Sequence, residues 1–110
     1  MKDPRALTER EQYARVYRQG TAWANSLIVL KAAPNHLTLS RYGFSVTKRV
    51  GKAVQRNRVK RLLREIMRLQ SLKPGWDVVF IARAAAVNAD YHQVERAVID
   101  LLTQAQLLEN

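Results

Sequence analysis

Residues 41–68 read RYGFSVTKRVGKAVQRNRVKRLLREIMR and carry most of the net charge of this 110-residue chain. The stretch holds ten of the nineteen Lys and Arg residues but one of the nine acids, so its net charge is +9. The remaining nine bases and eight acids leave the rest of the chain at +1. Like charges three or four positions apart repel one another along a helix unless a polyanion neutralises them, so the stretch predicts a nucleic-acid-binding surface.

The second half of the stretch has the spacing of an amphipathic helix, which we expect from about residue 53 to residue 70. Arginine outnumbers lysine on its polar side, and the planar guanidinium fork suits bidentate contacts with phosphate. The apolar side, which should pack on the core, consists of Val59, Leu62, Leu63, Ile66 and Met67. The opposite side carries Asn57, Lys60, Arg61, Arg64 and Arg68, with Arg56 and Arg58 at its two edges.

A first helix is expected from Leu7 to the residue before Gly20. It places Tyr13 and Tyr17 on one face, because they are four residues apart. Two interpretations of these rings stay open: they pack in the core, or they line a groove in which nucleotides stack on them. Residues 1–6, before this helix, are expected to form a flexible arm.

Strands are expected over residues 21–33, 37–41 and 43–47, where β-formers predominate or apolar and small polar residues alternate. The apolar run DVVFIAR, residues 77–83, predicts a buried central strand, and a last helix follows it. The order α-β-β-β-α-β-α predicts an α+β two-layer sandwich with a mixed sheet of about four strands.

The composition fits one domain over residues 1–110 and argues against several classes of protein. A hydrophobic content of 47% is too high for a disordered basic tail, and no stretch approaches the ~18–20 apolar residues of a membrane span. The N-terminus lacks the apolar core of a secretion signal, so we expect a cytoplasmic protein with no membrane partner. There is no cysteine, and the two histidines, His36 and His92, are too few for a metal site.

The ordered stretch from Gly43 to Arg64 resembles the protein component of bacterial ribonuclease P. That family has a glycine-led strand, a Lys/Arg pair and then Arg-Asn-x-x-Lys-Arg-x-x-Arg on a helix. Here these elements are Gly43-Phe-Ser-Val, Lys48-Arg49, and the run from Arg56 to Arg64. Flanking features agree over nearly the whole chain, including two early aromatic residues four positions apart and a strand that ends in Ala-Arg.

The resemblance implies an accessory subunit of an endoribonuclease whose chemistry is carried by a large RNA, with no catalytic residue in the protein. The holoenzyme removes the 5′ leader of precursor tRNA by Mg²⁺-dependent hydrolysis. The implied partners are therefore the catalytic RNA subunit and precursor tRNA, without an obligate protein partner. A left-handed β-α-β crossover around the basic helix is also implied, which is a rare hand for such connections.

Carried over position by position, the resemblance assigns two sets of residues. The set for the RNA subunit is Lys48, Arg49, Lys52, Arg56, Asn57, Arg58, Lys60, Arg61, Arg64 and Arg68. The set for the 5′ leader is Tyr13, Tyr17, Val29, Lys31, Phe44 and Ser45. Arg56 and Asn57 match positions tied to metal affinity in the family. Neither side chain coordinates Mg²⁺ well, so their effect on the ions should pass through the RNA.

Two positions depart from the family pattern. Many relatives carry an aromatic residue where this chain has Lys31, so a phosphate contact is expected there in place of base stacking. Trp23 replaces a smaller residue and belongs either to the core or to the lining of the leader cleft.

Three other functions compete with this interpretation. A nuclease that acts alone by two-metal hydrolysis needs clustered carboxylates, whereas only Glu9 and Glu11 lie close together in the sequence. A structural RNA-binding protein of the ribosomal type, or a DNA-binding helix module, needs little more than a basic recognition helix, and the ordered motif weighs against both. A membrane-surface helix would leave its apolar side uncovered, whereas here a sheet is expected to cover it.

Overall fold

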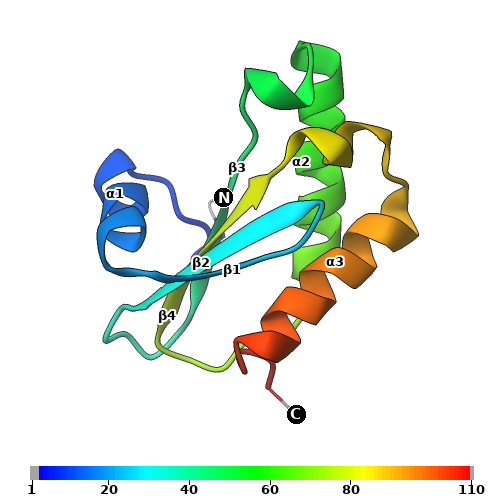
Figure 1. The fold of residues 1–110 in the computed structure, drawn as a ribbon. Helices are drawn as coiled ribbons and strands as arrows, with labels where there is room; N and C mark the ends of the chain where they lie inside the picture. Colours follow the sequence, from blue (N-terminus) through cyan, green and yellow to red (C-terminus); the bar gives the residue numbers. More distant parts are fainter. Residues whose placement is uncertain (1–2, 110) are drawn as a thin grey trace.

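The computed structural model describes residues 3–109, which form a mixed four-stranded sheet with helices on both faces (Figure 1). The helices are α1 (Arg10–Gln19), α2 (Ala53–Arg68) and α3 (Tyr91–Gln104), and the strands are β1 (Thr21–Ala24), β2 (Ile28–Pro34), β3 (Arg41–Ser45) and β4 (Trp76–Ala82). Two short 3₁₀ turns, η1 (Lys48–Val50) and η2 (Ala84–Asn88), lead into α2 and α3. The predicted α+β order and the mixed sheet are confirmed.

The strand order is β1-β2-β4-β3, and all neighbours are antiparallel except the parallel pair β3 and β4. Because α2 joins these two parallel neighbours, the basic helix is the crossover of a β-α-β unit. The central strand predicted from DVVFIAR is confirmed as β4, which lies between β2 and β3. The left hand expected for this crossover stays a prediction.

The main core lies between the sheet and the helices α2 and α3. The predicted apolar side of α2 is confirmed, because Leu62 is half-buried and the other members are fully buried, namely Val59, Leu63, Ile66 and Met67. A smaller cluster holds α1 on the opposite face of the sheet and consists of Leu7, Val16, Ala33 and Val79. Within residues 3–109, each helix is too short or too polar to cross a lipid bilayer.

The expected single strand over residues 21–33 is wrong, because this segment forms the hairpin β1–β2. Between the two strands, the Asn25 side-chain oxygen accepts hydrogen bonds from the backbone N–H groups of Leu27 and Ile28. An asparagine side chain that mimics a backbone turn in this way reverses the chain.

The expected strand over residues 37–41 is also wrong, because β3 begins at Arg41 and the residues before it form a loop. The Asn35 side chain accepts a hydrogen bond from the Leu37 N–H, and His36 takes a positive φ of 61°. Leu37 and Leu39, the apolar members of the alternating pattern, are exposed. Local turn formation therefore overrides that pattern.

The part of the N-terminal segment nearest α1 does not form the flexible arm that was expected. The Tyr42 N–H donates to the Arg5 carbonyl at 2.7 Å, and the Leu7 N–H donates to the Tyr42 carbonyl at 2.9 Å. The segment thus occupies the free edge of β3, where unpaired backbone groups attract a further strand-like segment. For the same reason α1 begins later than expected, while residues 1 and 2 lie outside the described residues.

Asp77 of β4 is fully buried, and side chains from three other segments hold it. Arg41 makes a bidentate contact with the carboxylate at 2.9 and 2.7 Å, Arg15 of α1 donates at 2.7 Å, and Asn35 donates at 2.9 Å. Burial by itself would raise the pKa of Asp77, but the hydrogen bonds from Arg41, Asn35 and Arg15 together hold that pKa below its usual value of 3.8. The cluster therefore ties α1 and the loop before β3 to the sheet.

Replacing Asp77 by Asn should destabilise the fold by about 3–5 kcal/mol at neutral pH, because Arg15 and Arg41 lose the carboxylate that neutralises them. Since the folded-state pKa is depressed, the contribution of Asp77 is full above pH 3.8 and is lost as the pH falls through the lower folded-state value. Urea unfolding from neutral to strongly acidic pH should show the stabilities of the two proteins converging. A difference that stays constant across this range would contradict the assignment.

Candidate nucleic-acid interface

The ten residues expected to bind the RNA subunit lie along α2 and the turn before it, and we call them the basic face. Lys48 and Arg49 belong to η1, Lys52 lies at the N-cap of α2, and the other seven lie on α2 itself. Three members are half-buried, namely Arg56, Arg58 and Lys60. The exposed members are Lys48, Arg49, Lys52, Asn57, Arg61, Arg64 and Arg68.

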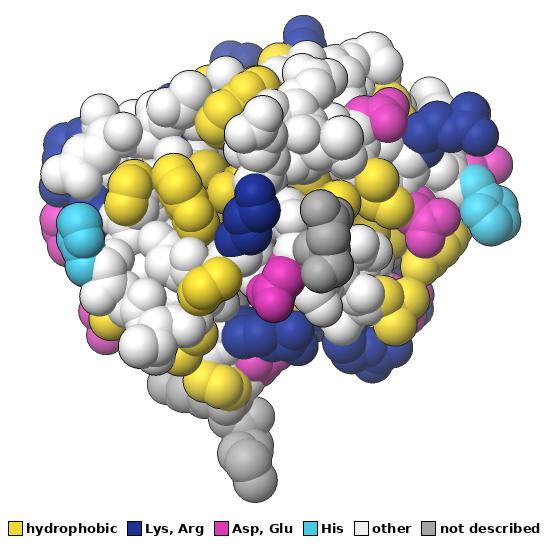
Figure 2. Space-filling model, turned by 90° about the horizontal axis from the view of Figure 1, so that it is seen from below, with side chains coloured by type: hydrophobic (Ala, Val, Ile, Leu, Met, Phe, Trp, Pro, Cys, Tyr) yellow, Lys and Arg dark blue, Asp and Glu magenta, His cyan; other side chains and the backbone are white. Residues whose placement is uncertain are grey.

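The nine cations of the basic face form no ion pair with any acid among residues 3–109. Four arginines elsewhere among residues 3–109 do pair with acids, namely Arg5, Arg15, Arg18 and Arg41. Figure 2 shows the molecule from below, where Lys and Arg side chains are interspersed with Asp and Glu side chains. No acid of residues 3–109 therefore pairs with the cations of the basic face, and their charge is available to a polyanion.

Arg58 differs from its neighbours because it also holds the protein together. Its Nη2 donates a hydrogen bond to the carbonyl oxygen of Ala89 at 2.8 Å, in the segment between η2 and α3. This contact fixes the edge of α2 against the start of α3, so the side chain has a structural role in the free protein.

Three of the residues expected to bind the leader share the sheet face that carries α1. Val29 of β2 and Ser45 of β3 both align with Ile81 of β4, so the three side chains point to the same side. Lys31 lies two residues further along β2 on that side. Its Nζ lies 5.5 Å from the centre of the Tyr17 ring, which is a cation–π contact between the sheet and α1.

The two tyrosines of α1 have different surroundings. Tyr17 is 39% exposed, so its ring remains open to a nucleotide base. Tyr13 is half-buried and rests on Gly43, where a Cβ would collide with the hydroxyl end of the ring. Burial raises the pKa of Tyr13 above its usual value. Tyr13 therefore contributes to packing, and the stacking interpretation of the two rings stays a prediction.

The structure does not bring Phe44 to the sheet face of the other leader residues, so its assignment to that set needs correction. Phe44 aligns with Phe80 across β3 and β4, and the two ring centres lie 6.1 Å apart at the main core. Side chains alternate along a strand, so Phe44 points away from the face that carries Ser45. Trp23 aligns with Leu30 and packs against the same core, which places it outside the leader cleft as well.

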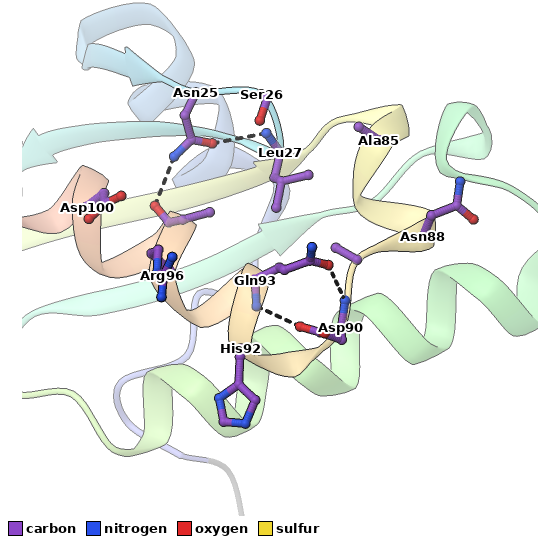
Figure 3. Close-up of a pocket in the computed structure, with 12 residues that line it drawn as sticks. Asn25, Ser26, Leu27, Ala85, Asn88, Asp90, His92, Gln93, Arg96 and Asp100 are labelled. Carbon is purple, nitrogen blue, oxygen red and sulfur yellow. Dashed lines mark hydrogen bonds between the residues drawn. The ribbon is translucent and has the colours of Figure 1, made fainter.

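A hollow of about 580 Å³ lies away from both sets of residues, between the β1–β2 turn, η2 and the start of α3 (Figure 3). Polar groups around it already have partners: Asn25 donates to the Ala97 carbonyl at 3.0 Å, and Asp90 accepts from the Gln93 N–H at 2.8 Å. The lining also contains side chains of opposite charge, Arg96 and Asp100. None of the residues assigned from the resemblance contributes to this hollow, and its mixed charge favours no particular ligand.

An α+β fold whose long helix packs its apolar side on the core and turns a row of arginines outward is typical of nucleic-acid-binding proteins. Within that class, the family model for ribonuclease P matches residues 1–106, and the chain belongs to this family. Members of the family are protein subunits of the endoribonuclease that matures the 5′ end of tRNA, with catalysis in the RNA subunit.

Relatives match over nearly their full length. The chain is 53% identical to the ribonuclease P protein component of Dehalococcoides mccartyi, over 98% of this chain and 90% of that one. It is 44% identical to the ribonuclease P protein component of Caldanaerobacter subterraneus, over 94% of this chain and 90% of that one. Among solved structures, the RNase P protein of Staphylococcus aureus superposes with a TM-score of 0.87 at 26% identity, covering 97% of this chain and 100% of that chain. The RNase P protein of Thermotoga maritima superposes with a TM-score of 0.82 at 28% identity, covering 96% of this chain and 98% of that chain.

Arg58→Ala should destabilise the free protein by about 1–2 kcal/mol, because it deletes the hydrogen bond from a charged group to the Ala89 carbonyl. The matched control is Arg64→Ala, which removes an exposed arginine from the same helix. That control should change stability by no more than about 0.5 kcal/mol. Chemical unfolding without RNA measures both, and equal losses would show that Arg58 has no special structural role.

Proposed function

We propose that this chain binds the catalytic RNA subunit of ribonuclease P through the basic face and binds the 5′ leader of precursor tRNA through the sheet face beside α1. It thereby assists the Mg²⁺-dependent removal of the leader, while the RNA carries the chemistry. The observation that supports this proposal most is the row of cations on α2 that find no acid among residues 3–109. Repulsion within this row of cations destabilises the free protein, and neutralisation by phosphates removes that repulsion and favours binding.

Electrostatics explains why a ribozyme would need this protein. A catalytic RNA that approaches a precursor tRNA brings two phosphate backbones together, and they repel. A folded surface of net charge +9 over residues 41–68 lowers that repulsion and releases condensed counterions. Since α2 is held on its apolar side by the core, the helix backbone that carries the guanidinium groups is already ordered when the RNA arrives, which reduces the ordering cost of binding.

The leader side has a different chemistry. The surface here consists of short, uncharged side chains, Val29 and Ser45, and the exposed ring of Tyr17. Lys31 adds one cation beside that ring. Stacking on a ring and contact with a phosphate are both tolerant of sequence, as binding to many precursor tRNAs requires. We assign these four residues to the leader and leave Phe44 out.

We place the Mg²⁺ ions of the holoenzyme on the RNA. Guanidinium and ammonium groups do not coordinate Mg²⁺, and among residues 3–109 no three His, Cys, Asp or Glu side chains gather in one place. The residues of the basic face therefore do not fit a direct metal site. Arg56 and Asn57 would affect the ions by fixing the RNA that holds them. We also propose a cytoplasmic location and no obligate protein partner, as suits a subunit that assembles with RNA.

Arg61→Ala should weaken assembly with the RNA subunit about ten-fold and lower the slope of log affinity against log salt by about 0.7–0.9, because one phosphate contact is lost. Filter binding at several salt concentrations measures both quantities. At low Mg²⁺, cleavage of precursor tRNA by the reconstituted holoenzyme should fall in parallel.

Arg96→Ala is the matched control, since Arg96 is an exposed arginine of α3 and lies outside the basic face. It should leave the salt slope for the RNA subunit unchanged. If Arg61→Ala and Arg64→Ala both kept wild-type affinity and slope, α2 would not be the docking surface. Cleavage by the protein without any RNA subunit would overturn the proposed division of labour.

Tyr17→Ala should weaken the affinity of the holoenzyme for precursor tRNA by about ten-fold while leaving its affinity for mature tRNA unchanged. The reason is that one stacking platform for the leader is worth about 1–3 kcal/mol and mature tRNA has no leader to lose. Equilibrium binding of the two RNAs to wild-type and variant holoenzymes makes the comparison, and equal losses for both would place Tyr17 outside the leader site.

A further inference from the structure

Tyr42 of β3 is a buried tyrosine whose hydroxyl group has no hydrogen-bond partner among residues 3–109. The residue is 6% exposed, and the centre of its ring lies 5.7 Å from the Arg5 guanidinium and 5.7 Å from the centre of the Phe44 ring. Within the same residues, every polar side-chain atom that is completely buried has a partner. The ring of Tyr42 is therefore enclosed, while the hydroxyl at its tip reaches the surface and can still accept or donate a hydrogen bond.

A hollow of about 320 Å³ lies beside Tyr42, between β3, the N-terminal segment and the C-terminal half of α2. Its lining consists of Asp3, Tyr42, Arg61, Arg64, Glu65 and Arg68. An adjoining hollow of about 300 Å³ shares Tyr42 and Arg64 and extends to Lys60 and Tyr13. The two hollows therefore lead from the basic face toward the base of α1.

The lining favours a phosphate group over other ligands. Three guanidinium groups outnumber the two carboxylates, and none of the three is paired with an acid among residues 3–109. Of the two acids, Asp3 is already paired with Arg5 at 3.5 Å. Burial raises the pKa of Tyr42, so its hydroxyl stays protonated at neutral pH and can donate a hydrogen bond. Guanidinium forks and a hydroxyl donor match the acceptor oxygens of a phosphodiester, whereas a metal cation would be repelled.

We propose that Tyr42, Arg64 and Arg68 bind one backbone phosphate of the RNA subunit in this hollow. The inference rests on the proposed docking of the basic face and adds a defined site to it. Asp3 and Glu65, the two acids of the lining, oppose the ligand by their charge and therefore limit how tightly the phosphate is held. The site joins the helix to the edge strand, so RNA bound there contacts two elements at once.

Tyr42→Phe tests the site because it removes the hydroxyl and keeps the packed ring. Affinity for the RNA subunit should fall about ten-fold, since hydrogen bonds to charged groups are among the stronger ones. The salt slope should stay unchanged, because no cation is lost. Tyr91→Phe, on the half-buried tyrosine at the start of α3, is the matched control and should change neither quantity.

Asp3→Asn supplies a second variant with the opposite expectation. Removal of its charge should tighten RNA binding about two- to five-fold if a phosphate lies beside it. Weaker binding would mean that Asp3 accepts a hydrogen bond from a base, and the phosphate assignment would be wrong. Inorganic phosphate titrated into the free protein at constant ionic strength should shift the Arg64 side-chain NMR signal in wild type but not in Tyr42→Phe.

Unchanged RNA affinity in Tyr42→Phe would overturn the inference, and a response to inorganic phosphate alone would then mark a site for the free ion rather than for RNA. The proposed docking face is tested separately by Arg61→Ala. If that variant weakens assembly while Tyr42→Phe does not, the phosphate site is wrong and the docking face stands.

Discussion

The structure depends on α2, where burial of the apolar side has to outweigh repulsion among the cations on the opposite side. One side of α2 is apolar and faces the core, and the other carries cations that repel one another. Burial of Val59, Leu63, Ile66 and Met67 anchors the helix against that repulsion, at roughly 1.5–3 kcal/mol for each large side chain. Binding of a polyanion removes the repulsion, so the free energy of unfolding should be coupled to RNA binding.

The acids of the chain are distributed in a way that preserves this charge. Asp77, the buried acid, neutralises Arg15 and Arg41 on the α1 side of the sheet. On the surface of α1, another carboxylate pairs with Arg18. The cations bound to Asp77 are thus compensated, while those of α2 pair with no acid among residues 3–109. Arg58 is intermediate, because its hydrogen-bond partner is a backbone carbonyl and not an acid.

The sequence predicts those features that depend on local periodicity. The buried side of α2 and the central strand β4 were predictable, because apolar spacing reports burial directly. The hairpin β1–β2 and the loop before β3 were not, because they depend on Asn25 and Asn35, whose side chains turn the chain without changing its apolar content. The resemblance supplied the basic face, but it grouped Phe44 with residues of the other sheet face, because a motif does not encode strand register. The ion pairs of Asp77 and the hollow beside Tyr42 form between residues that are distant in sequence, so a local sequence pattern does not predict them.

The parallel pairing of β3 with β4 has a consequence for the order of events during synthesis. These strands are separated by the whole of α2, so their ladder closes only after the chain has emerged as far as residue 82 from the ribosome. Until then the apolar side of α2 lacks β4, the strand that joins β2 and β3 into the sheet that covers it. The nascent protein therefore completes the support of its basic face late, when most of its length has already been translated.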